Sequence, residues 1–565
     1  MIEVLATNII SPLGCTTEQN YQAVRSGGSA LSSYSSWRNI PERFTASMFS
    51  EEQAATLMIQ GHTLFESIVI QSVREALSHT DIDVSSPRIV FILSTTKADV
   101  NELAAEECND GDYISPGKAA RKISDYLGVR TEPVVVCNAC ISGVTAQVLA
   151  DRLISSGHYD NAIVCGADCL SPFVVSGFMS FRSLSPEQCR PFDIERLGLN
   201  LGEAAATIIF GRPDNSSGDS WKLIAGALNN DAYHISAPSP SGDGSLGVIS
   251  RVLEGHDPDE LAMINVHGTA TMFNDQMESK AVERASLSHI PLTALKGYYG
   301  HTLGASGTLE TIISMRSLED GYILPVRGYE EMGVSGKITI SGAGTTTGKL
   351  SFMKMISGFG GCNGALLLSK AAPEGSVRIE GIRPSVSHRV HLTGSSLSID
   401  GKDVDVSSTG KALLSEIYRK YIADYPKFHK MDVFTKLVFA ATELLLRQET
   451  DVTSAEDRAI ILFNANSSIV ADRKHLATIS GSDGFFPSPS VFLYTLPNIV
   501  TGEIAIKHNY TGETSLYILD ERNDELIAQI VGSSFEQSGC TSMITGWVDC
   551  RDEDSFEADI EILTK

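Results

Sequence analysis

Residues 134–143, VVVCNACISG, narrow the fold more than any other part of the sequence. Val134–Cys137 is a β-branched run typical of a buried strand, and a short break separates it from a helical pattern that begins near Ile141. This order places the sulfur of Cys140 at the start of a helix, where the helix dipole and free N–H groups favour a thiolate. A nucleophilic cysteine is expected at such a position, although most free cysteines are buried structural thiols.

On both sides of this stretch, short β-rich runs alternate with helical patterns. Arg88–Leu93 and Ala162–Cys165 are β-rich, whereas Phe65–Leu77 and Val144–Ser155 have the helical spacing of apolar residues. A second alternating series covers residues 222–368. Strands and helices in turn predict an α/β fold with at least one buried, mostly parallel sheet.

The last third of the chain resembles the first third. A length of 565 residues is too great for one core. Shared α/β composition could produce any single match, but four matches in the same order favour a repeated lobe. The matching pairs are Val377–Pro384 with Val4–Pro12, Phe434–Leu446 with Phe65–Leu77, Arg458–Asn464 with Arg88–Ser94, and Ile544–Cys550 with Ile163–Cys169.

These patterns divide the chain into three lobes. The first lobe covers residues 1–213 and the second covers residues 214–370. A Gly- and Pro-containing linker at 371–376 precedes a third lobe at 377–565.

Composition and local patterns exclude several classes of function. Lys and Arg number 44 against 69 Asp and Glu, and the resulting net charge of −25 argues against nucleic acid as a partner. The N-terminus has neither a basic region nor a cleavage pattern, and no apolar run approaches the roughly 18 residues of a membrane span. We therefore expect a cytoplasmic protein that does not enter a membrane.

The ten cysteines are too few for a disulfide scaffold and are expected to be free thiols. Cys137 and Cys140 form one C-x-x-C pair. A zinc site needs a second pair of ligands, and Cys165 with Cys169 is only a loose candidate. We therefore expect no metal.

Two of the thirteen histidines lie in unusual surroundings. His267 follows the strand-like run Met263–Val266, and His301 lies in LKGYYGHTLGASG, which is rich in glycine. Glycines let backbone and substrate approach a histidine ring closely. The alternative for each is a loop histidine with satisfied hydrogen bonds.

Six motifs together make residues 1–370 resemble the β-ketoacyl-[acyl-carrier-protein] synthases, the condensing enzymes of the thiolase superfamily. The resemblance implies the thiolase-like fold with its duplicated αβαβα lobes, followed here by a third, incomplete thiolase-like lobe. The motifs are ISPLG from Ile10, NACISG from Asn138, RPFDIERLGLNLGEAAA from Arg190, HGTATMFNDQMES from His267, LKGYYGHTLGASG from Leu295 and SGFGGCNG from Ser357.

The resemblance implies catalytic roles for four residues. Cys140 would take an acyl group from a carrier protein as a thioester. His267 and His301 would donate hydrogen bonds to the malonyl thioester carbonyl and so stabilise the enolate that forms as carbon dioxide leaves. Lys296 matches the lysine that organises the two histidines.

Four further residues receive supporting roles from the same resemblance. The backbone N–H groups of Cys140 and Phe359 would hold the oxyanion, and the Phe359 ring would separate the acyl and malonyl pockets. Gly360 lies in the same Gly-rich loop and is grouped with Phe359. Asp275 and Glu278 match carboxylates that brace the site.

The function that these roles imply is decarboxylative Claisen condensation of an enzyme-bound acyl thioester with malonyl-[acyl-carrier-protein]. Such an acyltransferase serves fatty-acid, polyene or polyketide-type biosynthesis and needs no cofactor beyond the phosphopantetheine arm of its acyl carrier protein partner. The alternative is a non-catalytic scaffold that binds the carrier or determines chain length. The intact set of Cys140, His267, Lys296 and His301 favours the enzyme.

The third lobe resembles an inactive, truncated partner subunit of the kind called a chain-length factor. Aligning Asp549 with Asp168 sets Glu521 opposite Cys140, so the lobe lacks a nucleophile. Enzymes of this family dimerise through the strand that leads to the nucleophile. We therefore expect Ser515–Leu519 to pair antiparallel with Val134–Cys137, which would make a pseudo-dimer within one chain.

An acidic chain that binds an acidic carrier protein needs a local positive patch. A charged helix face is usually only solvated. The candidates for docking are Lys118, Arg121 and Lys122 on one short helix, with Arg182 and Arg190 shortly before the PFD segment.

Overall fold

The first sheet has five strands in an order that differs from their order in the chain. The computed structural model describes residues 1–104, 115–213, 219–371, 384–449, 457–480 and 485–565. In the first sheet, β1 pairs antiparallel with β8 and β8 pairs antiparallel with β6, while β6, β4 and β5 are parallel. The strands are β1 (Ile2–Ile10), β8 (Ala204–Gly211), β6 (Asn161–Asp168), β4 (Ile89–Ser94) and β5 (Val134–Val136).

Two further sheets repeat this order and these directions. In each, the first pair and the second pair are antiparallel, and the last three strands are parallel. This repetition confirms the thiolase-like fold and shows that the third lobe has the topology of the first. The second sheet is β9 (Lys222–Asn230), β16 (Cys362–Ser369), β15 (Ser351–Gly358), β10 (Met263–Asn265) and β11 (Pro291–Thr293); the third is β17 (Ser385–Thr393), β23 (Phe556–Thr564), β22 (Ser542–Cys550), β20 (Ala459–Asn464) and β21 (Thr514–Ile518).

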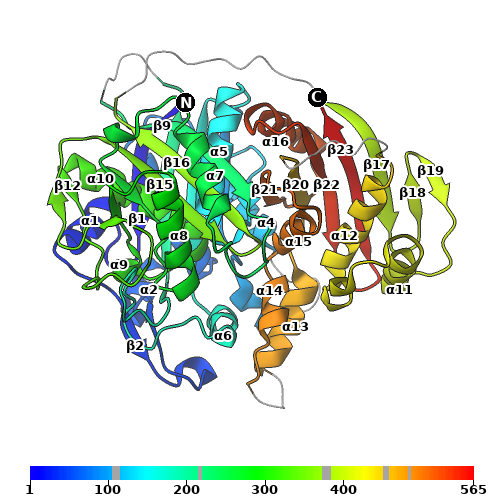
Figure 1. The fold of residues 1–565 in the computed structure, drawn as a ribbon, viewed down its shortest axis with the longest axis horizontal. Coiled ribbons are helices and arrows are strands. Elements are labelled where there is room, and N and C mark those ends of the chain that lie inside the picture. The colour runs from blue at the N-terminus through cyan, green and yellow to red at the C-terminus, as the bar shows by residue number, and fades with distance from the viewer. Residues whose placement is uncertain (105–114, 214–218, 372–383, 450–456, 481–484) are drawn as a thin grey trace.

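The first and third sheets are joined edge to edge. Val136 of β5 pairs antiparallel with Tyr517 of β21, and Val135 pairs with Ile518. In Figure 1, β21, β20, β22 and β23 continue the molecule away from the first two lobes. The predicted pairing in cis is confirmed, and the edge of β5, which would otherwise expose unpaired backbone groups, is covered.

Helix α5 (Ser142–Ser155) lies at the centre of the molecule, because it packs against α10 (Ser306–Glu319) of the second lobe and α16 (Asp524–Gln537) of the third. Every residue from Ser142 to Ala150 is buried. Its counterpart α16 has an exposed polar face instead, with Asp524 and Glu525 open to solvent. The helix that follows the nucleophile is therefore enclosed by all three lobes.

The first residues of the equivalent helices α5 and α16 correct one detail of the predicted alignment. α5 begins at Ser142 and α16 begins at Asp524, and the strand pairing gives the same register. The residue two positions before each helix is Cys140 in the first lobe and Arg522 in the third. The predicted counterpart, Glu521, is wrong by one residue, and the third lobe has no thiol at either position.

Two buried ion pairs also join the first and third lobes. Nζ of Lys97 lies 2.5 Å from Oδ1 of Asp472, and the guanidinium of Arg152 contacts both carboxylate oxygens of Glu513 at 2.9 and 2.7 Å. All four side chains are shielded from solvent. The lobes are therefore joined by charge as well as by the shared sheet.

Helices α13 (Ile469–Ser480) and α14 (Pro489–Tyr494) of the third lobe pack on α6 (Pro172–Ser180) of the first. In Figure 1 they lie between α6 and α12 (Val433–Leu446). α12 and its counterpart α3 (Leu64–Leu77) have 14 residues each, and side chains of Asp432 and Thr63 cap their N-termini.

The remaining elements surround the three sheets. Apart from Ala371, the predicted linker lies outside the described residues, as does most of the Val377–Pro384 match. Across the described ranges, no helix is both long and apolar enough to span a bilayer.

The other elements are α1 (Thr17–Arg25), α2 (Glu51–Leu57), α4 (Pro116–Leu127), α7 (Asp243–Val252), α8 (Met272–Arg284), α9 (Lys296–Tyr299), α11 (Gly410–Ile417), α15 (Ile499–His508), β2 (Ser32–Tyr34), β3 (Phe44–Ser47), β7 (Leu201–Gly202), β12 (Tyr322–Ile323), β13 (Thr339–Ile340), β14 (Thr345–Thr346), β18 (Leu397–Ile399) and β19 (Lys402–Val404).

Candidate active site

The strand–turn–helix segment around Cys140 forms as the sequence predicts. β5 ends at Val136, a single 3-10 turn covers Ala139–Ile141, and α5 follows directly. Ala139 adopts a φ of 48°, which is uncommon for a residue with a side chain and marks a strained turn. The turn places the sulfur of Cys140 beside two backbone N–H groups, its own and that of Phe359.

The environment of Cys140 corrects the expectation of a thiolate. Burial raises the pKa of the Cys140 thiol to about 12, and this effect outweighs the opposing influence of Lys296 and of the two N–H groups. The prediction considered the helix start but not the complete enclosure of the site by neighbouring elements. In the structure without substrate, Cys140 is therefore a neutral thiol at physiological pH.

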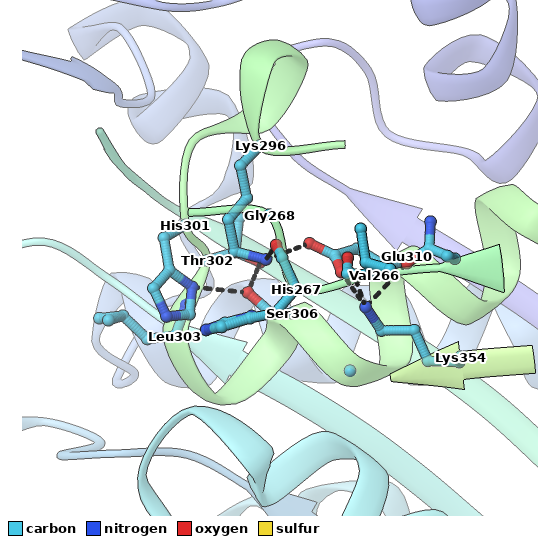
Figure 2. Close-up of polar contacts among 12 residues, drawn as sticks. Val266, His267, Gly268, Lys296, His301, Thr302, Leu303, Ser306, Glu310 and Lys354 are labelled. Carbon is cyan, nitrogen blue, oxygen red and sulfur yellow. Dashed lines mark hydrogen bonds and ion pairs between the residues drawn. The ribbon is translucent and has the colours of Figure 1, made fainter. Parts of the chain in front are cut away.

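His301 is held in one tautomer by its neighbours. The backbone N–H of Leu303 donates to Nδ1 of His301 at 3.2 Å, and Oγ of Ser306 lies 2.9 Å from the same nitrogen (Figure 2). Because a backbone N–H can only donate, Nδ1 is an acceptor, and the proton of the neutral ring is on Nε2. Nε2 is buried and has no hydrogen-bond partner among the described residues.

His267 lies across from His301. The ring centroids are 5.0 Å apart at an interplanar angle of 83°, and ligand atoms of Cys140, His267 and His301 all lie within 4.8 Å of one another. Burial lowers the pKa of both imidazoles well below the ordinary value, and Lys296 and Lys354 lower it further. The site therefore combines a neutral thiol with two neutral imidazoles.

A buried charge network supports the backbone at His267. Nζ of Lys296 donates to the carbonyl oxygen of His267 at 2.7 Å and to Oε1 of Glu310 at 2.8 Å (Figure 2). Lys354 binds the other oxygen of Glu310 and donates to Oδ1 of Asn265 at 2.7 Å. Lys296 thus supports His267 through the backbone carbonyl of that residue.

Glu310 and Lys354 were absent from the predicted site. The sequence did contain a signal that could have revealed both residues, because each is a charged residue inside an apolar run. Lys354 lies in SFMKMI, and Glu310 lies in TLETII. Charged residues are rarely fully buried unless they are paired, so each run indicated a hidden partner.

Glu278 and Asp275 brace the loop that carries His267. Glu278 accepts hydrogen bonds from the backbone N–H groups of His267 and Gly268 at 2.6 and 2.8 Å. Asp275 accepts from the N–H groups of Phe192 and Ala270 at 2.7 and 3.1 Å. Both carboxylates lie behind the loop, where the sequence analysis expected them.

A pocket opens onto the three reactive side chains. Cys140, His267 and His301 line its inner end, and Phe359 stands beside them. A second, smaller pocket lies behind Cys140 and shares Cys140 and Phe359 with the first. The ring of Phe359 therefore separates two spaces, consistent with the predicted position of a gate.

The third lobe closes the smaller pocket. Phe492 and Leu496 line it, and the centroid of the Phe492 ring lies 5.7 Å from that of Phe178. The sequence does not identify Phe492 and Leu496 as pocket residues, because nothing in the local pattern of the third lobe indicates contact with Cys140.

Gly360 does not join the oxyanion donors. Its N–H already donates to the carbonyl oxygen of Ile235 at 2.7 Å. Its φ is 94°, and a side chain at this position would come within 2.8 Å of Nδ2 of Asn498. Gly360 instead permits close approach of the third lobe.

The five predicted docking residues do not form a free positive patch. Arg121 is ion-paired with Glu132, and Lys122 lies 2.6 Å from Glu66. Arg190 lies 3.3 Å from Glu195. Of these five residues, only Lys118 and Arg182 are exposed and form no ion pair with a described residue.

Comparisons with family models and curated proteins match most of the first two lobes. Residues 1–215 match the model described as "Beta-ketoacyl synthase, N-terminal domain", and residues 222–330 match "Beta-ketoacyl synthase, C-terminal domain". The chain is 25% identical over 413 residues to 3-oxoacyl-[acyl-carrier-protein] synthase 2 of Coxiella burnetii, covering 65% of this chain and 98% of that protein. It is 31% identical over 225 residues to nodulation protein E of Rhizobium leguminosarum bv. trifolii, covering 38% and 56% respectively.

Solved structures match the fold, in one case along the whole chain. The structure described as "PfaC Keto synthase-Chain length factor" aligns with a TM-score of 0.78 and 14% identity over 100% of this chain and 78% of that one. The ketosynthase ApeO of Xenorhabdus doucetiae, solved in complex with its chain length factor ApeC, aligns with a TM-score of 0.55 and 25% identity over 65% of this chain and 97% of that one. The first match includes the third lobe.

Proposed function

The chain belongs to the β-ketoacyl synthase family, whose members are acyltransferases, and from this premise we propose that it catalyses decarboxylative Claisen condensation of an enzyme-bound acyl group with a malonyl group on acyl carrier protein. One observation carries the proposal. A cysteine thiol and two imidazoles line one pocket, and ligand atoms of the three side chains all lie within 4.8 Å of one another.

The first step transfers an acyl group to Cys140. The sulfur attacks the carbonyl carbon of an acyl-phosphopantetheine thioester, and the bond from that carbon to the pantetheine sulfur breaks. The thiol proton of Cys140 goes to the departing pantetheine thiolate. The N–H groups of Cys140 and Phe359 hold the oxyanion of the tetrahedral intermediate. Since the resting thiol is neutral, its proton leaves as the carbon–sulfur bond forms.

The second step breaks a carbon–carbon bond of the malonyl group. The N–H on Nε2 of His301, together with His267, donates to the malonyl thioester carbonyl. Carbon dioxide leaves without its bonding electrons, which form the enolate that the two donors stabilise. The enolate carbon attacks the acyl-Cys140 carbonyl, and the sulfur departs and takes up a proton. The product is a β-ketoacyl group on the carrier.

A second candidate function is a non-catalytic scaffold that determines chain length. Phe492 and Leu496 line the pocket behind Cys140. Their position favours a role in chain length for the third lobe, but not for the first two lobes. The complete reactive set in the first two lobes favours an enzyme that contains such a lobe.

The proposal is tested with purified chain, acyl-primed and malonyl-loaded carrier protein, and mass spectrometry of the carrier-bound products. We expect release of carbon dioxide and a β-ketoacyl carrier longer by two carbons. A panel of saturated, unsaturated and aryl primers defines the acyl group. Carrier that returns unchanged with every primer would refute the condensing enzyme and leave the scaffold.

Replacing Phe492 with alanine is expected to let longer acyl groups enter. Phe492 closes the pocket behind Cys140, and removal of its ring leaves space that an acyl chain can fill. One methylene in such a pocket changes kcat/KM by about tenfold or more. We therefore expect kcat/KM to rise by about tenfold for an acyl donor that is one methylene longer than the longest donor accepted by the unchanged chain.

The control for Phe492 is Phe486→Ala in the same lobe, since Phe486 is 72% exposed. Its product lengths should match those of the unchanged chain. Equal chain-length profiles for Phe492→Ala and Phe486→Ala would show that the third lobe does not limit the acyl group.

A further inference from the structure

A basic surface segment in the third lobe stands out in a chain with a net charge of −25. It precedes α12 and covers a π-helical turn, Tyr418–Ile422, and a 3-10 turn, Pro426–Lys430. Its lysine, arginine and histidine side chains are all exposed, and they are Arg419, Lys420, Lys427, His429 and Lys430.

Acidic residues within this segment do not cancel its charge. Asp424 is 3.2 Å from Lys507, and the buried carboxylate of Asp432 caps α12 by accepting from Phe434 and Thr435. Lys420 is the member of the basic set that is neutralised, because it lies 2.6 Å from Glu416.

Three cations of the segment therefore remain available. Arg419, Lys427 and Lys430 are exposed and form no ion pair with any described residue. We call these three residues the third-lobe basic patch.

The internal repeat shows that this charge is particular to the third lobe. α3 and α12 occupy the same place in their lobes, so the segment before α3 is the counterpart of the basic segment. That counterpart, Glu51–Thr63, contains Glu51 and Glu52 and neither Lys nor Arg. Two copies of one structural unit thus carry opposite charge at the same place.

The segment that carries the patch contacts the same carboxylate as α14, the helix that lines the pocket behind Cys140. Tyr425, between Lys420 and Lys427, donates its hydroxyl to Glu503 at 3.2 Å, and Tyr494 of α14 donates to the same carboxylate at 3.0 Å. α14 also carries Phe492, which lines that pocket. In Figure 1, α14 and α13 lie between α12 and α6.

We propose that the third-lobe basic patch is the docking surface for the acidic face of the acyl carrier protein whose phosphopantetheine arm enters the pocket at Cys140. This inference rests on the proposed function. Opposite charges raise the rate of encounter and orient the partner, and a protein with net charge −25 would otherwise repel an acidic carrier. The assignment replaces the α4 residues, of which Arg121 and Lys122 are already ion-paired.

The test reverses the charge of two patch residues in the full chain, Lys427→Glu with Lys430→Glu. The matched control is Lys118→Glu with Lys402→Glu, which changes the same charge on α4 and β19, where both lysines are exposed. Binding of a purified, acidic holo-acyl carrier protein is followed by fluorescence anisotropy at several salt concentrations. Condensation is measured in parallel with carrier-bound malonyl and with malonyl-N-acetylcysteamine, which has no carrier.

For the patch variant we expect a Kd about tenfold higher, a weaker salt dependence, and an unchanged rate with the carrier-free substrate. A Kd within twofold of the unchanged chain, or an equal loss in the control variant, would overturn the docking site. Binding of the patch to anionic vesicles without binding to carrier would also overturn it. If the unchanged chain condenses neither substrate, the proposed function fails instead, so the two failures are distinguishable.

Discussion

Cys140→Ala is expected to lose condensation by a factor of about 10⁴ or more, because no other thiol among the described residues faces both oxyanion donors. Cys362 lines the same pocket, but its sulfur is directed to the carbonyl oxygen of Phe359 at 3.3 Å. The measurement is single-turnover acyl transfer from radiolabelled acyl carrier, with the label retained on the protein as readout.

The same variant should still release carbon dioxide from malonyl carrier, since the donors on His267 and His301 remain. The pKa of each imidazole lies well below the ordinary histidine value, so both rings stay neutral throughout the range from about pH 6.5 to 8. The rate of decarboxylation should therefore be constant across this range. Acylation of Cys140→Ala at the rate of the unchanged chain would contradict the assignment of the nucleophile. A decarboxylation rate that falls across this range would contradict the neutral histidines.

Arg152→Met is expected to destabilise the chain by about 3–5 kcal/mol, because it leaves the buried carboxylate of Glu513 without its cation. Arg152 lies on α5 and Glu513 precedes β21, so the loss falls on the contact between the first and third lobes. The measurement is the urea midpoint followed by tryptophan fluorescence, with Trp547 of β22 as a reporter in the third lobe.

The double variant Arg152→Met with Glu513→Met serves as its control. Removal of both charges leaves no unpaired ion, so most of the lost stability should return. Two results would show that this pair does not hold the lobes together. One is a single variant whose free energy of unfolding falls by less than about 1 kcal/mol, and the other is a double variant that is less stable than the single one.

Local sequence was sufficient for much of the fold, whereas the roles of Cys140, His267 and His301 came from the family resemblance. The segment around Cys140 predicts its own strand, turn and helix, because adjacent residues determine each element. The pairing of Ser515–Leu519 with Val134–Cys137 was predicted from the family resemblance, because members of that family dimerise through the equivalent strand, and the structure confirms it. The bracing roles of Asp275 and Glu278 came from the family resemblance.

Properties that depend on enclosure could not be predicted in this way. The pKa of Cys140 is raised by elements distant in sequence, whereas the helix start alone suggested the opposite direction. Contacts between lobes were equally hidden, because Lys97, Asp472 and Phe492 show ordinary local patterns. The ion pairs of Arg121 with Glu132 and of Lys122 with Glu66 were hidden as well, because charge in sequence does not reveal which cations already have carboxylate partners.

The pairing of β5 with β21 within one chain has a consequence for assembly. Two separate proteins meet at a rate set by their concentrations, whereas tethered lobes meet at an effective concentration that can reach the millimolar range. Dilution therefore cannot separate the first lobe from the lobe that closes its pocket. Under the proposed function, Cys140 is thereby matched with one fixed pocket wall, so a cell that makes several such proteins cannot exchange walls among them and mix their product lengths.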